Sequence, residues 1–341
     1  MPTFSDERLA RANGIELAYQ EIGDPGGEPL ILIMGLAAQM LAWQEEFCGM
    51  LAGRGFRVVR FDNRDIGHST MLDEAGMPSR VDMLSGRRAT APYTLHDMAE
   101  DTFGLMDQLE IGSAHLVGAS MGGMIAQTMA IDDPERVRSL VSVMSTTGNR
   151  WIGQPSFKAW GLLLAKFPKG REDYVKRSVR TFRVIGSPRY ATHEDEIAEL
   201  AGAMYDRGHN PAGIVRQMHA ISASGNRTAA LRRLDLPTTV LHGSEDPLAR
   251  PASGRATANA IPGARLRIFE GMGHDLPREL WPDFVEEIAN AAERSRTSTE
   301  FPPHGPEPCA STSSATAAGA GNLARQRLAK IASSRRYRLG D

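Results

Sequence analysis

One serine lies in a sequence context that is typical of an activated nucleophile. Ser120 is the central residue of Gly-Ala-Ser-Met-Gly at 118–122, between an apolar run at 115–117 and a helical pattern that begins at Met124. A serine hydroxyl is a weak nucleophile, so an enzyme that uses one holds it on a tight strand-to-helix turn within reach of a base. The glycines of the motif allow the close backbone approach that such a turn requires. The motif and its flanks therefore predict a nucleophile elbow.

Two further residues have the types and the chain order that would activate this serine. Asp246 follows an apolar run at 239–242, and His274 lies in a glycine-rich loop after an apolar run at 266–269. This chemistry needs a base that takes the serine proton and an acid that orients the base, and Ser, Asp, His is one of the known chain orders. Singly, the aspartate would also fit a helix cap and the histidine a loop residue bonded to backbone. Because each follows a predicted strand, we predict that the three form one triad.

Neighbouring titratable residues leave alternatives open. Glu245 is adjacent to Asp246 and is the rival acid. His68 is the second candidate base, although it precedes the nucleophile in the chain. His242 is expected to be structural because it ends a buried strand, and Asp275 is expected to point away from the histidine beside it.

Acyl transfer also requires backbone N–H groups that bind the developing oxyanion. They come from the residue after the nucleophile and from a loop that follows an early strand. In this chain those residues are Met121 and Leu36, the second of which follows the apolar run at 30–34. The polar stretch at 62–69 is predicted to be an internally hydrogen-bonded turn that braces the same site.

The elements that must position these residues are short apolar runs that alternate with helical patterns. The runs lie at 30–34, 57–61, 115–117, 140–144, 239–242 and 266–269. Strands that alternate with helices predict an α/β fold with a mostly parallel, doubly wound sheet. In such sheets ligands bind beyond the carboxyl ends of the strands, which is where the candidate residues stand.

The strand pattern stops between residues 147 and 234. Apolar residues there, among them Trp151, Phe157 and Trp160, recur at roughly helical spacing. This predicts a helical cap inserted into the sheet domain, with most of its apolar side chains packed and a minority lining an acyl pocket. We therefore expect a core at 1–146 and 235–295, a cap at 147–234, and a disordered tail rich in Pro, Ala and Ser at 296–341.

Charge and composition narrow the possible partners. The 341 residues carry 39 Lys and Arg against 41 Asp and Glu, a net charge of -2, so no nucleic-acid partner is expected. The basic end of the tail, 323–339, is expected to be a solvated appendage, and the alternative is a short basic helix that contacts a partner or an anionic surface. The chain has no Cys/His ligand spacing and no phosphate-binding glycine loop, so neither a metal nor an organic cofactor is expected.

The cysteines and the apolar runs favour a cytoplasmic location. Cys48 and Cys309 are the only two cysteines, so a disulfide framework is not expected. The first residues are charged where a signal peptide would be apolar. The longest apolar run, at 30–43, is interrupted and shorter than the roughly 20 residues of a membrane-spanning helix.

Taken together, residues 9–292 resemble the α/β-hydrolase superfamily, and more narrowly the bacterial lipase/esterase group related to aclacinomycin methylesterase. The resemblance rests on Ile-Met-Gly-Leu at 33–36 with Trp43, on 61–69, on 118–124, and on Gly-Met-Gly-His-Asp-Leu-Pro at 271–277. It implies hydrolysis of carboxylic esters, with lipid esters, thioesters and methyl esters of polyketides among the substrates. Many relatives carry His-Gly-x where this chain has 34–36, so the backbone donor is kept while the histidine is absent.

We therefore expect a serine hydrolase of the lipase or carboxylesterase type that cleaves a small-molecule ester or lipid through an acyl-enzyme. Alternatives that keep the triad are C–C bond hydrolysis, thioester hydrolysis and perhydrolysis. An alternative of a different class is a non-catalytic ligand-binding member of the fold. An aspartate nucleophile is disfavoured because the elbow carries Ser120.

Overall fold

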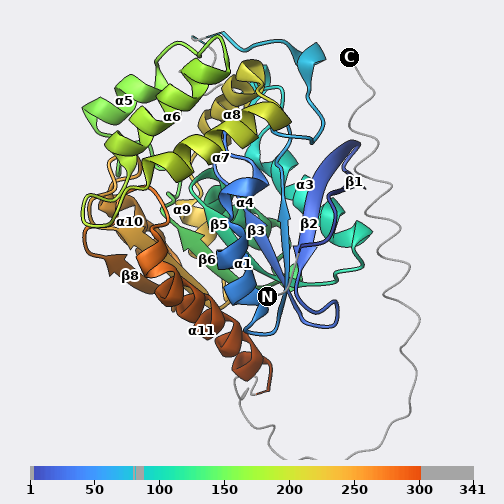
Figure 1. Ribbon diagram of the computed structural model, residues 1–341. Coiled ribbons are helices and arrows are strands. Elements are labelled where there is room, and N and C mark those ends of the chain that lie inside the picture. The colour runs from blue at the N-terminus through green and yellow to red at the C-terminus, as the bar shows by residue number, and fades with distance from the viewer. Residues whose placement is uncertain (1–3, 80, 82–87, 301–341) are drawn as a thin grey trace, which may run out of the picture. The chain divides into compact units, whose positions relative to one another are not determined.

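An eight-stranded sheet is the centre of the computed structural model, which describes residues 4–79, 81 and 88–300 (Figure 1). The strand order is β1-β2-β4-β3-β5-β6-β7-β8. The strands are β1 (Arg8–Ala12), β2 (Ile15–Ile22), β3 (Glu28–Ile33), β4 (Phe56–Phe61), β5 (Ala114–Ala119), β6 (Val137–Val143), β7 (Thr238–Gly243) and β8 (Arg265–Phe269).

Strands β3 to β8 pair in parallel, whereas β1 and β2 form an antiparallel hairpin whose second strand pairs with β4. The predicted mostly parallel, doubly wound sheet is confirmed, and the six predicted runs lie in β3 to β8. The prediction omitted the hairpin. Its turn consists of Asn13 and Gly14, whose φ angles of 48° and 81° are those of a two-residue turn that joins antiparallel strands.

Helices cover both faces of the sheet because successive strand residues point to opposite sides. Ile31 and Ile33 pack in one buried cluster with α3 (Leu95–Gln108) and α4 (Met121–Asp132). The alternate residues Leu30 and Leu32 pack in a second cluster with α1 (Glu45–Ala52) and α11 (Trp281–Glu300). Helix α10 (Pro251–Ala260) packs against β7 and β8. Strands β3 to β7 are thus largely buried on both sides, and their carboxyl ends are held at fixed positions.

The last helix continues beyond the residue where the tail was predicted to begin. Helix α11 ends at Glu300, whereas the sequence suggested a boundary at 296. The remainder of the predicted tail, 301–341, with its basic end and Cys309, lies outside the described residues. Cys48 is a free, buried thiol, and burial raises its pKa to about 12.

Four helices follow β6 and lie together beyond one end of the sheet (Figure 1). They are α5 (Phe157–Leu163), α6 (Arg171–Ile185), α7 (Glu194–Arg207) and α8 (Pro211–Ser224). The next helix, α9 (Thr228–Leu231), differs because Leu231 is buried in the cluster with α3 and α4. Trp151 and Phe157 are 86% and 94% exposed, so the expectation that this region's apolar side chains pack is wrong for these two.

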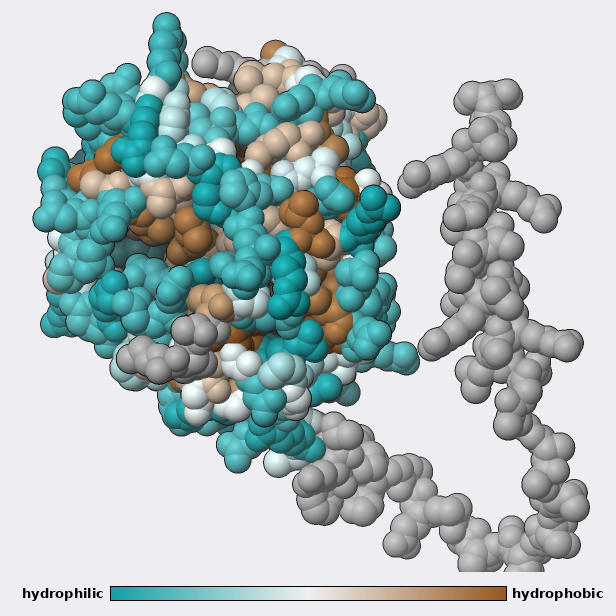
Figure 2. Space-filling model, turned by 45° about the vertical axis from the view of Figure 1, so that its right-hand side comes forward, coloured by the Kyte–Doolittle hydropathy of each residue, from teal (hydrophilic) through white to brown (hydrophobic). Residues whose placement is uncertain are grey.

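Apolar side chains also occur on the face of the molecule drawn in Figure 2, where brown groups are separated by larger hydrophilic areas. Such scattered groups are ordinary for a folded domain. Among the described residues, no helix combines the length and the apolar character needed to cross a bilayer.

Candidate active site

Ser120 occupies a strained turn between β5 and α4. Its φ and ψ are 55° and -117°, a conformation that costs energy for a residue with a side chain and is typical of functional sites. A Cβ on Gly118 would lie 2.2 Å from the carbonyl oxygen of Gly122, and one on Gly122 would lie 2.0 Å from that of Ile33. These glycines are therefore required by the close approach of three backbone segments. The turn leaves the Ser120 side chain only partly buried.

The three residues predicted as a triad lie in one hydrogen-bonded chain. His274 Nε2 is 3.1 Å from Ser120 Oγ, and His274 Nδ1 is 2.7 Å from Asp246 Oδ2. The other carboxylate oxygen, Oδ1, accepts the N–H groups of Leu248 and Ala249, both at 2.8 Å. Asp246 is 2% exposed and His274 8%. These three hydrogen bonds hold the buried carboxylate in a fixed position beside the imidazole.

The rival residues lie elsewhere or have other partners. Glu245 is exposed on the same loop, and His68 is bound through Nδ1 to Glu7 at 2.6 Å. His242 Nε2 is hydrogen-bonded to the carbonyl oxygen of Ala249, and burial lowers its pKa, which keeps the ring neutral near pH 7. Asp275 has a partner of its own, the hydroxyl of Ser187 in the connection after α6, from which it accepts a hydrogen bond.

The loop that carries the histidine is held by the connection after α6, a contact that the sequence analysis did not identify. The His274 N–H donates to the carbonyl oxygen of Ile185 at 2.7 Å. The Gly273 N–H donates to Ser187 Oγ at 2.9 Å, and the Ser187 hydroxyl donates to Asp275 Oδ1. Burial raises the pKa of Asp275 while the hydrogen bond from Ser187 lowers it, and the net shift is upward. The position of the imidazole therefore depends on the inserted helices.

The predicted oxyanion loop is held by two buried amide side chains. Asn63 Nδ2 donates to the carbonyl oxygen of Met34 at 2.9 Å. Gln217 Oε1 accepts the N–H of Ala37 at 3.2 Å, while its Nε2 donates to the carbonyl oxygen of Arg64 at 2.9 Å. Ala37 has a φ of 63°, so this loop is a defined turn. Leu36 lies between these two attachment points.

Two features bring this loop and the nucleophile together. A Cβ on Gly35 would lie 3.1 Å from the Ser120 Cβ, so the two segments are in contact. Met121 begins α4, where the first backbone N–H groups have no partner within the helix.

Gln217 was not predicted as a site residue, although the sequence contained a signal for it. With Ile214 and Ile221 it forms an i, i+3, i+7 row on α8, where a polar residue interrupts the apolar face.

The stretch at 62–69 is a buried polar network that joins the sheet to the inserted helices. Asp62 accepts the N–H of Met40 at 2.7 Å and contacts Arg207 Nη2 at 2.9 Å. Asp65 and Arg216 form a bidentate pair at 2.6 and 2.8 Å with both side chains 0% exposed. The predicted bracing turn thus bonds to helices α7 and α8 as well as to itself.

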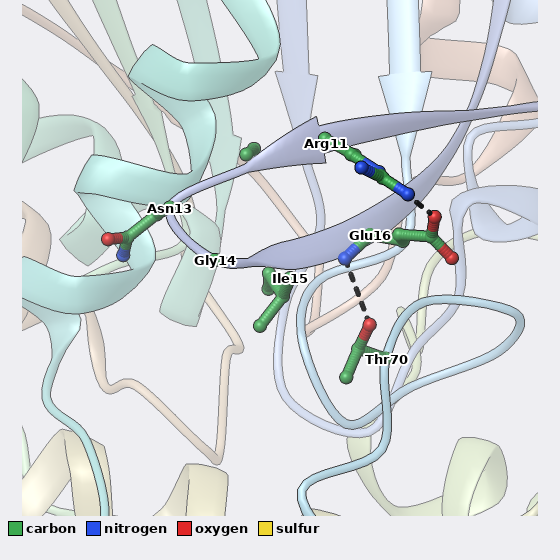
Figure 3. Close-up of a pocket in the computed structure, with 7 residues that line it drawn as sticks. Arg11, Asn13, Gly14, Ile15, Glu16 and Thr70 are labelled. Atoms are coloured by element: carbon green, nitrogen blue, oxygen red, sulfur yellow. Dashed lines mark hydrogen bonds and ion pairs between the residues drawn. The ribbon is translucent and has the colours of Figure 1, made fainter.

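The described residues show no metal-binding cluster, and the hollow at the β1–β2 hairpin is separate from the candidate active site. Among the described residues, no group of three His, Cys, Asp or Glu side chains is placed to hold a metal ion. A hollow at the β1–β2 hairpin is lined by seven residues, among them Arg11, Glu16 and Thr70 (Figure 3). Thr70 Oγ1 there accepts the N–H of Glu16 at 2.9 Å. None of these seven residues takes part in the hydrogen bonds that join Ser120, His274 and Asp246.

Comparisons with known proteins agree with this architecture. A family model described as alpha/beta hydrolase fold matches residues 28–277. Rhodomycin D methylesterase DauP from a Streptomyces species is 30% identical over 81% of this chain and 93% of that protein. The corresponding DnrP of Streptomyces peucetius is also 30% identical, with the same coverage. A meta-cleavage product hydrolase from Pseudomonas fluorescens has a similar structure, with a TM-score of 0.67, 20% identity, and coverage of 84% of this chain and 98% of that one.

Proposed function

The chain belongs to the alpha/beta hydrolase fold family, and from this premise we propose that it hydrolyses carboxylic esters with Ser120 as nucleophile. The observation that carries the proposal is the pair of contacts made by one imidazole, 3.1 Å to Ser120 Oγ and 2.7 Å to Asp246 Oδ2. A serine becomes reactive when such a base is within hydrogen-bond reach and is itself oriented by a third group.

The first half of the reaction forms an acyl-enzyme. His274 Nε2 takes the Ser120 proton as Oγ attacks the ester carbonyl carbon, and Asp246 stabilises the resulting imidazolium. The carbonyl oxygen becomes an oxyanion, which the N–H groups of Met121 and Leu36 bind. The imidazolium then protonates the departing alkoxide, so the alcohol leaves and the acyl group stays on the serine.

The second half repeats the sequence with water. His274 takes a proton from the water that attacks the acyl carbon, and the same two N–H groups bind the second oxyanion. Collapse of that intermediate expels the Ser120 oxygen, which recovers its proton from the imidazolium. The acid is released and the enzyme is restored with all protons accounted for.

We propose methyl esters as the first substrates to test, because two relatives that are 30% identical are named rhodomycin D methylesterases. If the enzyme also hydrolyses long-chain esters, it is of the lipase type. A panel of methyl, short-chain and long-chain esters with matched thioesters separates these substrate classes. Two further assays test the alternative reactions that use the same residues. Substrates with a hydrolysable C–C bond test C–C bond hydrolysis, and an assay with hydrogen peroxide tests perhydrolysis.

The nucleophile is tested by Ser120→Ala. This change should lower kcat by roughly 10⁴-fold or more, because removal of one member of such a unit abolishes the covalent route. A fluorophosphonate probe should label the parent protein and fail to label the variant, with circular dichroism as the control for folding. Ester turnover that persists in Ser120→Ala would overturn the proposal, and labelling at Ser120 without turnover would favour the non-catalytic alternative.

A further inference from the structure

Helix α5 is apolar on both sides, and only one side is packed. Ala159 is 0% exposed, Leu162 and Leu163 are half-buried, and the helix packs against α6. Phe157, Trp160 and Leu164 follow at i, i+3 and i+7 on the opposite face, where they are 94%, 36% and 52% exposed. A helix at the surface of a domain normally places charged residues on this side. Trp151, 86% exposed, lies just before the same helix.

Along the sequence, the segment that contains this helix carries charges of one sign, whereas the exposed Glu172 and Asp173 begin the neighbouring helix α6. Between Glu135 and Glu172 the sequence contains no Asp or Glu. Over the same stretch Arg150, Lys158 and Lys166 are exposed. The chain as a whole has a net charge of -2, so this segment is locally basic on a slightly acidic protein.

We propose that the α5 surface, defined as Trp151, Phe157, Trp160 and Leu164 with the cations Lys158 and Lys166, docks on an anionic phospholipid bilayer. Exposed Trp, Phe and Leu beside Lys is the composition by which amphipathic segments lie in the bilayer interface. Lysine side chains extend along apolar groups and keep their charge at the headgroups. This proposal goes beyond ester hydrolysis and does not depend on it.

Two other possible partners of the α5 surface match its positive charge less well than an anionic bilayer does. A second copy of this chain in a twofold contact would place the same lysines opposite one another. The chain's own end, 301–341, is also basic, with Arg325, Arg327 and Lys330 among its cations. Like charges repel in both cases, whereas an anionic bilayer supplies the opposite charge over an extended plane.

The α5 surface is connected to the loop that carries Asp246. The Ser156 N–H donates to the carbonyl oxygen of Pro247 at 2.7 Å, and the Arg250 N–H donates to that of Gly153 at 3.2 Å. A Cβ on Gly153 would lie 1.8 Å from Ser253 Oγ, so the contact is tight. Docking would therefore hold a loop of the active site at a fixed position relative to the membrane.

The test uses the full-length protein and flotation with vesicles of phosphatidylcholine and phosphatidylglycerol in equal parts. The parent should bind these vesicles, bind vesicles of phosphatidylcholine alone less, and be released by high salt. Trp43 and Trp281 are 1% and 5% exposed, so a vesicle-induced blue shift of tryptophan emission would come from Trp151 and Trp160. Trp151→Ser with Phe157→Ser should reduce partitioning roughly tenfold or more, given the apolar area lost.

Charge and control variants complete the design. Lys158→Gln with Lys166→Gln should also weaken binding, by roughly 25-fold, because each cation near an anionic surface contributes about a fivefold effect. The matched apolar control is Leu9→Ser with Leu266→Ser, and the matched charge control is Arg232→Gln with Arg233→Gln; all four residues are exposed and lie outside the α5 surface. Circular dichroism and fluorophosphonate labelling should be unchanged in every variant.

Three outcomes would overturn the proposal. The first is that the parent does not bind the anionic vesicles. The second is that Trp151→Ser with Phe157→Ser binds as the parent does, which would assign membrane contact to the basic end of the chain. The third is a dimer in analytical ultracentrifugation that this double variant abolishes while vesicle binding is absent, which would make the α5 surface a contact between copies.

Discussion

At the scale of single residues, Gln217 connects the inserted helices to the proposed oxyanion donor. Its side chain is 0% exposed, and its two hydrogen bonds join Ala37 of one loop to Arg64 of another. A buried amide that satisfies both its donor and its acceptor fixes the groups it touches. Because Leu36 is adjacent to Ala37, the direction of the proposed donor depends on a residue in α8.

Gln217→Met tests this positioning role. Loss of the amide should lower kcat by roughly tenfold with little change in KM, since complete loss of an oxyanion donor typically costs ~10²–10³ in rate and misalignment costs less. Steady-state kinetics on a short soluble ester and the rate of fluorophosphonate labelling measure the effect. The matched control is Gln127→Met, which removes an equally buried amide bonded to Ser142 and Arg227. Equal effects of the two changes on kcat would contradict the role.

At the scale of elements, one ion pair attaches α8 to the sheet domain. Arg216 contacts Asp65 through Nε and Nη2 and donates from Nη1 to the carbonyl oxygen of Gly76 at 2.8 Å. Tyr93 donates to the same carboxylate at 2.8 Å, and burial together with the Asp65 charge raises the pKa of its phenol, which keeps that donor protonated. Removing one partner would leave a buried charge without compensation.

Arg216→Met should therefore destabilise the protein by about 3–5 kcal/mol, the usual cost of breaking a buried pair from one side. Urea denaturation followed by circular dichroism measures the change in unfolding free energy. The same substitution at Arg183, whose pair with Glu194 is exposed, is the matched control and should alter stability far less. If the two variants unfold at the same urea concentration, the attachment of α8 does not depend on this pair.

At the scale of the whole molecule, the central strand β5 contains a buried titratable group that couples stability to pH. His115 is 2% exposed, with Nδ1 2.9 Å from Ser139 Oγ on β6 and Nε2 3.4 Å from Glu28 Oε2 on β3. Burial lowers its pKa from 6.5 to about 4, although Glu28 acts in the opposite direction. The folded protein therefore holds the ring neutral over a range in which the unfolded chain protonates it.

This sets the direction of the pH effect. The contribution of His115 to stability is complete above the unfolded pKa of 6.5 and declines as the pH falls toward about 4. Within that window the unfolding free energy should fall by about 1 kcal/mol per pH unit on account of this residue. Urea denaturation at several pH values, compared with His115→Gln, measures the difference in slope. Parallel slopes for the two proteins would show that His115 does not contribute.

Several whole-molecule expectations remain predictions. These are the division into core and cap at 147 and 235, the disorder of the tail, the cytoplasmic location, and the role of the basic end. Residues 301–341 lie outside the described residues, and the vesicle experiments with the full-length protein test the basic end.

The sequence by itself was sufficient for the fold class and for the positions of the candidate residues. A strand, a Gly-x-Ser-x-Gly turn and a helix are local patterns, and Ser120, Asp246 and His274 each follow an apolar run that forms a strand. Parallel strands bring their carboxyl ends to one edge, so the common location followed from local signals. The β1–β2 hairpin has a local signal as well, since Asn13-Gly14 is a preferred sequence for a two-residue hairpin turn.

Only the tertiary structure decided which side chains meet. The preference for Asp246 over Glu245 depends on side-chain direction within one loop, and the roles of Gln217 and Ser187 depend on contacts between segments far apart in the chain. The exposure of Trp151 and Phe157 depends equally on how α5 packs. Periodicity describes the faces of one element, whereas these contacts are set by the packing of several elements against one another, which no local pattern encodes.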